Sequence, residues 1–412
     1  MSNMLETIII GGGQAGLATS YYLVRHGREH IVLEQAAQAG NVWRNERWDS
    51  FTFVSPNWSI LLPGAEYAGP YPDDFMPRDE IVEYFRRYED RFHLPVRHNT
   101  RVTSVEQISE GLGYQVCTPT DEFRARNVVV ATGFFQTPKL PSFSSQLPSD
   151  IKQLTSGQYR NPAALPPGAV LVVGSGQSGC QIAEDLYQSG RTVYLCVGSA
   201  GRVVRRYRGK DIFEWLLRSG FFDRTSDMLP SSRMRFAGMP QVSGARGGHS
   251  INLHQFARDG VVLLGHILAV QDEKVLLAGD LMENLARADK FEADLLKMID
   301  DFIEQAGIAA PAESVPILRD GFDSQVRREL NLREAGITSI IWATGFKCDF
   351  SWVKPASVDG DGYPKQHRGI TNCPGLYFVG LPWLSKLKSG LLIGVGEDAA
   401  YVASHIAGET RD

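Results

Sequence analysis

Two stretches of the chain share one pattern of hydrophobic and polar positions. Residues 5–34 and residues 169–199 each begin with an apolar run, pass through a cluster of glycines, continue as a helical stretch and close in a second apolar run. Short apolar runs bounded by glycine are typical of strands buried on both faces of a parallel sheet. Each stretch therefore predicts a strand, a tight turn, a helix and a second strand, which together form a βαβ unit.

Two later apolar strands end in one tripeptide, Ala-Thr-Gly, at residues 131–133 and 343–345. Each follows one βαβ unit at a distance that fits the last strand of the same half of the molecule, and glycine lets the chain turn where a side chain would clash. Near the C-terminus, residues 375–398 predict a strand and a loop, followed by a helix that ends at about residue 406. These marks complete two separate sheets.

The region between the second unit and the final strands is less regular. Residues 202–260 are rich in arginine and glycine and have poor periodicity, so we expect loops and short helices there. Short strands are predicted at 261–270 and 274–277, and a long amphipathic helix is predicted from about residue 281 to residue 305.

The composition and the net charge of the chain are those of an ordinary globular protein. It has 412 residues, which is enough for two or three domains, with 43% hydrophobic residues, 22% charged residues and a formal net charge of −5. Nothing in this balance indicates nucleic acid as a partner. The N-terminal apolar run is too short for a signal peptide and lacks a basic flank, and no run approaches the length of a membrane span. We expect a cytoplasmic protein that does not bind membranes.

The cysteines and histidines offer no metal site. Five cysteines are spread along the chain without a C-x-x-C pair, so neither a zinc site nor a redox dithiol is expected. Cys180 opens the second predicted helix and is expected to be a packing residue. His249 and His254 lie five residues apart, which is poor spacing for metal ligands, so locally bonded side chains are expected.

Both glycine clusters fit the pattern G-x-G-x-x-G, at Gly11, Gly13 and Gly16 and again at Gly174, Gly176 and Gly179. In this fingerprint the first glycine allows the tight turn, the second lets backbone amides approach a pyrophosphate, and the third lets the helix pack against the strand. Two fingerprints in matching context predict two dinucleotide sites.

The residue after the second strand differs between the units. Glu34 ends the first unit, and a carboxylate there accepts hydrogen bonds from a ribose 2′-hydroxyl, which suits FAD or NAD. Val197 takes that place in the second unit and is followed by Ser199, Arg202, Arg205 and Arg206. Hydroxyl and guanidinium groups suit a 2′-phosphate, so NADPH is predicted there. A solvated basic loop, or an acidic substrate held by the arginines, is the alternative.

The predicted fold is α/β, with two dinucleotide-binding, Rossmann-like domains in a glutathione-reductase-like two-domain flavoprotein. The FAD-binding domain is predicted at 1–145 and 335–412, and the NADPH-binding domain at 146–334, with the irregular insertion at about 202–260. A helix that begins near residue 394 would direct its positive end at the edge of a flavin.

Several motifs along the chain resemble those of a known protein family. Glu34 with the first fingerprint, the run Gly-Asn-Val-Trp-Arg at 40–44, Asn57, the Pro-Tyr-Pro-Asp-Asp-Phe stretch at 70–75 and the paired Ala-Thr-Gly marks are similar to class B flavoprotein monooxygenases. Within that class the chain is most similar to flavin-containing monooxygenases and the related plant auxin-forming enzymes. The resemblance covers nearly the whole chain and is weakest over residues 218–268.

The resemblance implies FAD, NADPH and molecular oxygen as the redox equipment, and a small molecule as substrate. It implies a flavin C4a-hydroperoxide that passes one oxygen atom to a soft nucleophile, nitrogen or sulfur, with Asn57 as the active-site asparagine. The predicted cofactor-binding positions are Gly11, Gly13, Gln14, Ala15, Gly16, Glu34, Gln35, Trp43, Arg44, Val102, Ala131, Thr132, Gly133, Gly174, Gly176, Gln177, Ser178, Gly179, Ser199, Arg202, Arg205, Arg206, Ala343, Thr344, Gly345, Gly380, Leu392 and Gly394.

One segment departs from the family pattern. Between the fingerprints the family carries F-x-G-x-x-x-H-x-x-x with a closing aromatic residue. The corresponding run, 153–162, keeps the aromatic residue as Tyr159 but has Thr155 in place of the histidine. The missing tryptophan at its end argues against a Baeyer-Villiger monooxygenase. The missing histidine leaves open an NADPH-dependent flavin reductase that passes electrons to a quinone or another acceptor. A non-catalytic nucleotide-binding module is the last alternative, and a homodimer is as compatible with the sequence as a monomer.

Overall fold

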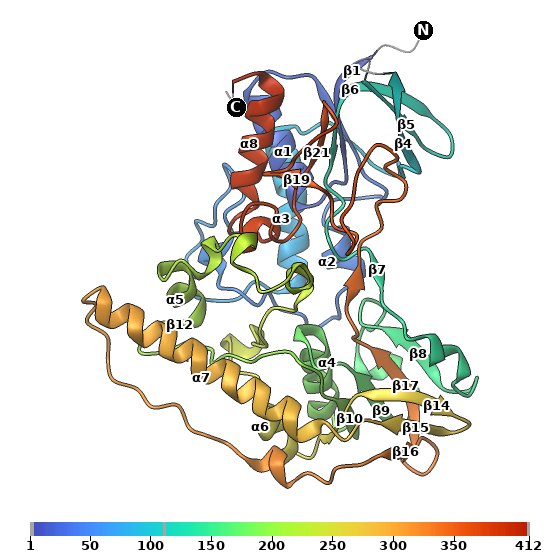
Figure 1. The fold of residues 1–412 in the computed structure, drawn as a ribbon, viewed down its shortest axis with the longest axis vertical. Coiled ribbons are helices and arrows are strands. Elements are labelled where there is room, and N and C mark those ends of the chain that lie inside the picture. Colours follow the sequence, from blue (N-terminus) through green and yellow to red (C-terminus); the bar gives the residue numbers. More distant parts are fainter. Residues whose placement is uncertain (1–3, 110–112, 410–412) are drawn as a thin grey trace.

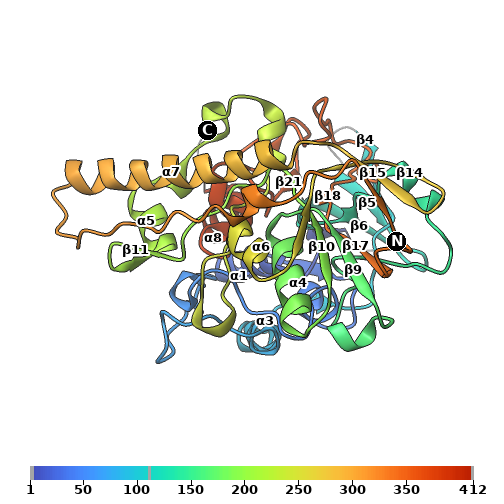
Figure 2. The ribbon, with the colours of Figure 1, turned by 90° about the horizontal axis from the view of Figure 1, so that it is seen from below.

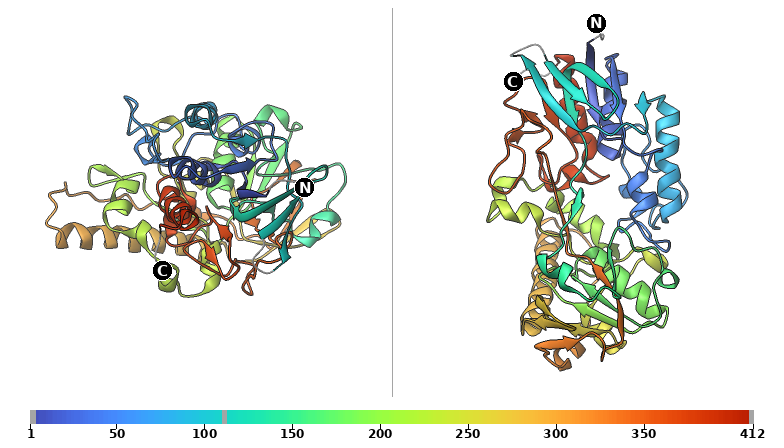
Figure 3. Two further views of the ribbon diagram at one scale, coloured as in Figure 1. Left: turned by 90° about the horizontal axis from the view of Figure 1, so that it is seen from above. Right: turned by 90° about the vertical axis from the view of Figure 1, so that its right-hand side faces the viewer.

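The computed structural model describes residues 4–109 and 113–409, and it forms two lobes, one above the other in Figure 1 and in the right-hand panel of Figure 3. The upper lobe contains a nine-stranded sheet and the lower lobe a five-stranded sheet. The predicted α/β fold with two Rossmann-like domains is confirmed. None of the helices in the described ranges is long and apolar enough to cross a bilayer.

The upper sheet begins with the first predicted βαβ unit. Its strands run in the order β19-β20-β21-β6-β1-β2-β3, and β21, β6, β1, β2 and β3 are parallel to one another. A hairpin formed by β4 and β5 extends the sheet beside β6, and this hairpin had no signal in the sequence pattern. The bounds are β1 (Leu5–Ile10), β2 (His30–Leu33), β3 (Val96–Arg97), β4 (Ser104–Ser109), β5 (Gly113–Cys117), β6 (Glu122–Val130), β19 (Gln366–His367), β20 (Ile370–Thr371) and β21 (Leu376–Phe378).

Alternate side chains of the upper sheet enter two different cores. Ile9 of β1 packs toward the helices, whereas Ile8 and Ile10 face the opposite side, where the β4–β5 hairpin lies. This two-residue alternation is the period of a strand buried on both faces. The helices of the upper lobe are α1 (Gln14–Arg25), α2 (Asn41–Asn45), α3 (Arg78–Phe92) and α8 (Val395–Ala407).

The lower sheet has the order β13-β10-β9-β17-β8, and all of its pairs are parallel. Val170 and Val172 of β9 face α4, whereas Leu171 and Val173 face the small antiparallel sheet of β14, β15 and β16. The bounds are β8 (Lys152–Thr155), β9 (Ala169–Val173), β10 (Val193–Cys196), β13 (Val262–Leu264), β14 (Ile267–Gln271), β15 (Lys274–Leu277), β16 (Glu329–Asn331), β17 (Ile337–Trp342) and α4 (Gln177–Gln188).

The boundary predicted at residue 335 is wrong by about the length of one strand. β17 bonds with β9 and β8, so it belongs to the second sheet and not to the returning part of the first domain. The chain crosses back to the upper lobe after residue 345, where β18 (Phe346–Lys347) pairs antiparallel with β7 (Thr137–Pro138) of the outgoing segment. The two crossings between the lobes therefore lie side by side.

The irregular region contacts both lobes. It contains β11 (Arg206–Tyr207), β12 (Lys210–Asp211), α5 (Ile212–Arg218), α6 (Leu253–Arg258) and short 3-10 turns, as its poor periodicity predicted. Trp215 and Phe222 pack with Trp383 and Leu387 of the upper lobe. The predicted long helix is confirmed as α7 (Leu281–Gln305), the gold helix that runs along one side of the molecule in Figures 1 and 2.

Candidate functional site

The first glycine of each fingerprint meets an Ala-Thr-Gly mark. Gly11 and Gly174 have φ of 107° and 105°, in the left-handed region that favours glycine. A Cβ on Gly11 would lie 2.7 Å from the carbonyl oxygen of Ala131, and one on Gly174 would lie 2.5 Å from that of Ala343. Two motifs that were separate in the sequence thus form one turn in each lobe.

The other two glycines of each fingerprint have opposite surroundings. A Cβ on Gly16 or Gly179 would overlap the carbonyl oxygen of the first glycine of the same fingerprint, so these positions pack helix against strand. Gly13 and Gly176 are the N-caps of α1 and α4, and a Cβ there would meet no atom within 4 Å. Open space beside the N-terminus of a helix is what a pyrophosphate requires, so both turns fit a dinucleotide.

Glu34 turns back onto the first fingerprint. One carboxylate oxygen accepts the Gly12 N–H at 2.6 Å, and the other accepts the Ala36 N–H at 2.8 Å. The carboxylate is half-buried and retains lone pairs on both oxygens. This position fits a ribose with free hydroxyl groups.

The second unit has the reverse arrangement. Val197 is buried, and the hydroxyl of Ser175 in the fingerprint accepts the Gly198 N–H at 2.9 Å. Gly174 N–H donates to the Cys196 carbonyl, as Gly11 N–H donates to that of Leu33, so Val197 does occupy the place of Glu34. The end of β10 therefore has no carboxylate at this place, and Ser199 after it is exposed.

Two of the arginines predicted to bind the cofactor form buried ion pairs inside the protein. Arg202 is 5% exposed and pairs with both oxygens of Glu292 at 2.9 and 3.1 Å and with Asp289. Arg205 is 2% exposed and pairs with Asp211 at 2.7 Å. Both guanidinium groups are therefore held in ion pairs within the protein. The backbone of Arg202 pairs with that of Gln241, whose side chain donates to the Ser175 carbonyl of the second fingerprint.

Arg205 bonds the irregular region to the upper lobe, and Arg206 bonds two parts of the irregular region to each other. Arg205 donates to the Val54 carbonyl at 2.7 Å and its guanidinium carbon lies 4.6 Å from the centre of the Phe75 ring, both in the upper lobe. Arg206 is exposed, and its guanidinium donates to the carbonyls of Gly247 and Gly248 at 3.1 and 3.2 Å.

Asn57 lies on a short 3-10 turn (Asn57–Ser59) beside the loop that contains Tyr71. Its side chain is 5% exposed, and Nδ2 donates to the Tyr71 carbonyl at 3.0 Å. Oδ1 is buried and has no hydrogen-bond partner among the described residues. Because an unpaired buried acceptor is costly, this oxygen is a candidate contact for a bound ligand.

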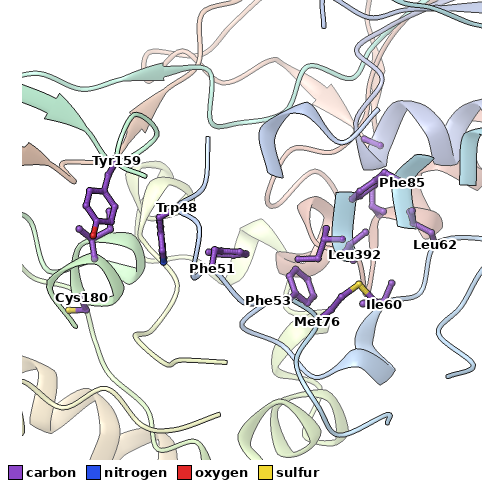
Figure 4. Close-up of a cluster of buried hydrophobic side chains, with 14 of the residues drawn as sticks. Trp48, Phe51, Phe53, Ile60, Leu62, Met76, Phe85, Tyr159, Cys180 and Leu392 are labelled. Carbon is purple, nitrogen blue, oxygen red and sulfur yellow. The ribbon is translucent and has the colours of Figure 1, made fainter. Parts of the chain in front are cut away.

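Aromatic side chains fill the space between the two lobes beside Asn57. Figure 4 shows Trp48, Phe51 and Phe53 in a row between Tyr159 of the lower lobe and Leu392 of the upper lobe. Neighbouring rings in this segment contact one another, with centroids 5.1 Å apart for Trp48 and Phe51. Trp43 packs on Phe51 and Phe53, and Arg44 is exposed. The rings of this row are buried or partly buried in one hydrophobic cluster that contains residues of both lobes.

The segment that departs from the family pattern forms a contact between the lobes. Thr155 stays within its own turn, where its N–H and hydroxyl group both donate to Gln158 Oε1, at 2.9 and 3.2 Å. Tyr159 instead donates to Asp185 at 2.5 Å, and the other oxygen of Asp185 accepts from Ser50 of the upper lobe at 2.6 Å. Arg160 donates to the Asn45 carbonyl across the same boundary.

The C-terminal segment closes over the first fingerprint. Gly380 has φ of 83°, and a Cβ on it would overlap the side chain of Ala15. Gln14 donates to the Gly390 carbonyl at 2.7 Å. Leu392 and Gly394 lead into the N-terminus of α8, as predicted, and Gly394 caps that helix.

The remaining predicted positions lie at the edges of these two turns. Gln35 is exposed after Glu34, and Val102 packs with the cluster that contains Leu33. Ser178 is half-buried in the first turn of α4. Thr132 accepts from Gln136 at 3.1 Å, and Thr344 donates to the Lys139 carbonyl. Gly133 and Gly345 have φ of 73° and 86°, which starts the two crossings between the lobes.

Residues 241–248 of the site had no signal in the sequence. Gln177 bonds with both the N–H and the carbonyl of Val242, and Gln241 donates to the Ser175 carbonyl. Gly244 and Gly248 have no room for a Cβ, because it would overlap the Phe53 carbonyl and the Phe75 ring. Residues 241–248 thus lie between the second fingerprint and the segment that carries Asn57, which only the folded chain reveals.

Two cysteines and two histidines are held by burial or by hydrogen bonds within the protein. Burial raises the pKa of the Cys180 and Cys196 thiols. His249 bonds with Glu184 at 2.6 Å, and His254 is buried against Asp289. Across residues 4–109 and 113–409, no cluster of three or more ligating side chains could hold a metal ion.

Comparisons with known proteins agree with this geometry. Residues 8–211 match the model of the pyridine nucleotide-disulphide oxidoreductase family. An uncharacterized CzcO-like oxidoreductase of Geobacillus kaustophilus is 32% identical over 410 residues, which cover 98% of this chain and 99% of the relative. A probable indole-3-pyruvate monooxygenase of Arabidopsis thaliana, YUCCA1, is 28% identical over 429 residues, covering 98% of this chain and 90% of the relative.

A solved structure shows the same fold. The flavin-containing monooxygenase from Stenotrophomonas maltophilia superimposes with a TM-score of 0.66 at 20% identity, over 98% of this chain and 99% of that protein. The predicted resemblance, the flavoprotein class and the oxidoreductase activity are confirmed by these relatives. The chain belongs to the family of the CzcO-type oxidoreductases, and it is similar to flavin-containing monooxygenases in sequence and fold.

Proposed function

We propose that this protein is an NADPH- and O2-dependent flavoprotein monooxygenase that transfers one oxygen atom to a nitrogen or sulfur atom of a small molecule. The observation that carries the proposal is the position of Asn57: it lies on the segment between two complete dinucleotide turns, and its buried Oδ1 has no partner among the described residues. Such an oxygen is available to accept a hydrogen bond from a bound ligand.

The residues that would hold each cofactor follow from the two turns. Gly13, the α1 N-terminus and Glu34 would hold FAD, and Gly176 with the α4 N-terminus would hold NADPH. When bound, these groups supply hydride transfer and activation of oxygen. The chain itself orients them and excludes water, with the aromatic row from Trp48 to Phe53 between the sites.

The absence of a usable dithiol supports oxygen transfer over disulfide chemistry. All five cysteines are unpaired, and burial raises the pKa of Cys180, Cys196 and Cys348, the last to about 11. A thiol that stays protonated at neutral pH is a poor nucleophile.

A second candidate, an NADPH-dependent flavin reductase that passes electrons to a quinone or another acceptor, is favoured by one observation. The hydroxyl group of Thr155, in the place of the family histidine, donates to Gln158 within its own turn. A threonine hydroxyl cannot supply the imidazole that the family pattern has at this position.

The test is the ratio of oxygenated product to NADPH consumed, measured with a panel of sulfides and tertiary amines under labelled oxygen. The proposal predicts one labelled oxygen atom in the product. In Asn57→Ala, NADPH oxidation should continue while product falls and peroxide rises. Asn331→Ala removes an amide that lies on β16 and bonds within its own turn, and it should keep the native ratio. Peroxide as the sole product of every substrate would support the reductase instead.

A further inference from the structure

The end of β10 lacks a carboxylate, and Arg202 and Arg205, which were expected to replace it, pair with carboxylates elsewhere. In a Rossmann unit the residue after the second strand lies beside the adenosine ribose of the bound dinucleotide. The side chains that surround residues 197–199 therefore determine whether a ribose 2′-phosphate or a 2′-hydroxyl is accepted.

One imidazole lies beside this strand end. His266 follows β13, the neighbour of β10 in the sheet, and a Cβ on Gly198 would lie 3.5 Å from its Nε2. Its side chain is 49% exposed. Ser199, the next residue on the loop, is also exposed.

Asp280 fixes the orientation of this imidazole. The ring Nδ1 of His266 donates to one oxygen of Asp280 at 2.5 Å, and the His266 peptide N–H donates to the other at 3.1 Å. Burial raises the pKa of Asp280, but the hydrogen bonds from His266 outweigh this and lower it. Both oxygens of this carboxylate already accept hydrogen bonds from His266, so the carboxylate orients the ring and is not a free acceptor for a ribose hydroxyl. In the imidazolium form both ring nitrogens donate, and with Nδ1 bonded to Asp280 the donor left for a phosphate oxygen is Nε2.

α7 adds a guanidinium group beside the same strand end. Asn284, which is 2% exposed, donates to the Val197 carbonyl at 3.1 Å and so ties the helix to the end of β10. Arg287, one turn further along α7, is exposed and donates to the Asn284 side chain at 2.9 Å through one nitrogen. Its other donors are available, and a planar guanidinium is suited to phosphate oxygens.

We propose that His266, together with Arg287 and Ser199, recognises the 2′-phosphate of the dinucleotide at the second fingerprint and makes the site prefer NADPH over NADH. This rests on the proposed function only in placing a nicotinamide dinucleotide at that fingerprint. In this arrangement Arg202 and Arg205 support the loop and the irregular region from within, without touching the cofactor.

The test uses the full chain with FAD bound and two small probes, adenosine 2′,5′-bisphosphate and adenosine 5′-monophosphate, titrated by calorimetry. His266→Gln should weaken binding of the bisphosphate about tenfold, the loss expected for one charge-assisted phosphate contact, and leave the monophosphate unchanged. Arg287→Gln should act in the same direction. Lys290→Gln removes an equal charge from α7, where Lys290 pairs with Asp294 at 2.9 Å, and should change neither probe.

Three results would overturn this assignment: an unchanged ratio of the two affinities in both His266→Gln and Arg287→Gln, equal weakening of both probes, or a selective loss found only in Arg206→Gln. FAD absorbance reports that each variant is folded. Because no oxygen is consumed, failure here is separate from failure of the monooxygenase proposal, which the product measurement tests.

Discussion

Gln14 and Gln177 occupy the same position in the two fingerprints, and each bonds with the backbone of a distant segment that covers its own turn. Gln14 donates to the Gly390 carbonyl at 2.7 Å, and Gln177 bonds with the N–H and the carbonyl of Val242. The repeat in the sequence therefore extends to how each dinucleotide turn is closed. The two covering segments are unrelated in sequence, one C-terminal and one in the irregular region.

Substitution of Gly176 and of Gly179 in the second fingerprint should affect different properties, cofactor affinity in the first case and stability in the second. Gly176 has φ of −70° and open space around it, so Gly176→Ala should fold with FAD bound and lose NADPH affinity by roughly tenfold or more, a cost of ~1.4 kcal/mol for each factor of ten. In Gly179→Ala the new Cβ would overlap the Gly174 carbonyl, and overpacking costs about 1–3 kcal/mol.

Thermal unfolding and NADPH titration of both variants distinguish these outcomes. A lowered melting temperature in Gly176→Ala, or a native one in Gly179→Ala, would show that the roles are assigned the wrong way round.

Glu34 should determine how tightly FAD is retained. Its carboxylate accepts two backbone N–H groups, and a hydrogen bond to a charged group is worth about 1.5–3 kcal/mol. Glu34→Gln replaces one acceptor by a donor that faces an N–H, so the purified variant should contain less flavin per chain. Glu29→Gln, an exposed carboxylate before the same strand, is the control. Equal flavin content in the two variants would remove Glu34 from the FAD site.

Much of this arrangement could be predicted from the sequence, because glycine spacing and buried apolar runs are local signals. Such signals predicted the two βαβ units, α7 and the equivalence of Val197 in the second unit to Glu34 in the first. The β4–β5 hairpin did not, because its alternating strands are short and partly polar.

The ion-pair partners of the charged side chains could not be predicted from the sequence. Arg202 and Arg205 stood in the expected place along the chain, but their carboxylate partners Glu292 and Asp211 became neighbours only in the fold. His266 was overlooked for the same reason, since it reaches the end of β10 from the neighbouring strand β13. Its position directly after a parallel strand was the one available signal.

The contact between the lobes should depend on the pair Tyr159 and Ser50, which share Asp185. Burial raises the pKa of Tyr159, so its hydroxyl remains a donor at neutral pH. Tyr159→Phe should lower the free energy of unfolding by about 1–2 kcal/mol, because it removes a hydrogen bond to the half-buried carboxylate of Asp185. Tyr187→Phe removes an exposed 3.4 Å contact between α4 and Asp259 and should cost far less.

A double-mutant cycle with Ser50→Ala measures whether the two contacts act together. Residues that share one partner usually couple by at least 0.5 kcal/mol or so, whereas simple additivity would mean that the lobes are held elsewhere.

Asp398 should make stability depend on pH. It is buried in the first turn of α8, and burial raises its pKa although Ser385 donates to it at 2.6 Å. A carboxyl group whose folded pKa exceeds its unfolded value favours the folded state at low pH, and this contribution is lost as pH rises through the folded pKa.

The melting temperature of the native protein, relative to that of Asp398→Asn, should therefore fall as the pH rises above about 4, the ordinary pKa of an aspartate. A difference that stays constant or grows as the pH rises would show that Asp398 is not held in its neutral form by burial.

The central claim is that the two dinucleotide turns and Asn57 together protect a reduced flavin long enough for oxygen transfer. The most direct test is rapid mixing of the reduced protein with oxygen, with and without NADP⁺. The account predicts a distinct absorbing species between the reduced and oxidised spectra, longer-lived with NADP⁺ and consumed by an added sulfide. Direct return to the oxidised spectrum with release of peroxide, whether or not NADP⁺ is present, would contradict it.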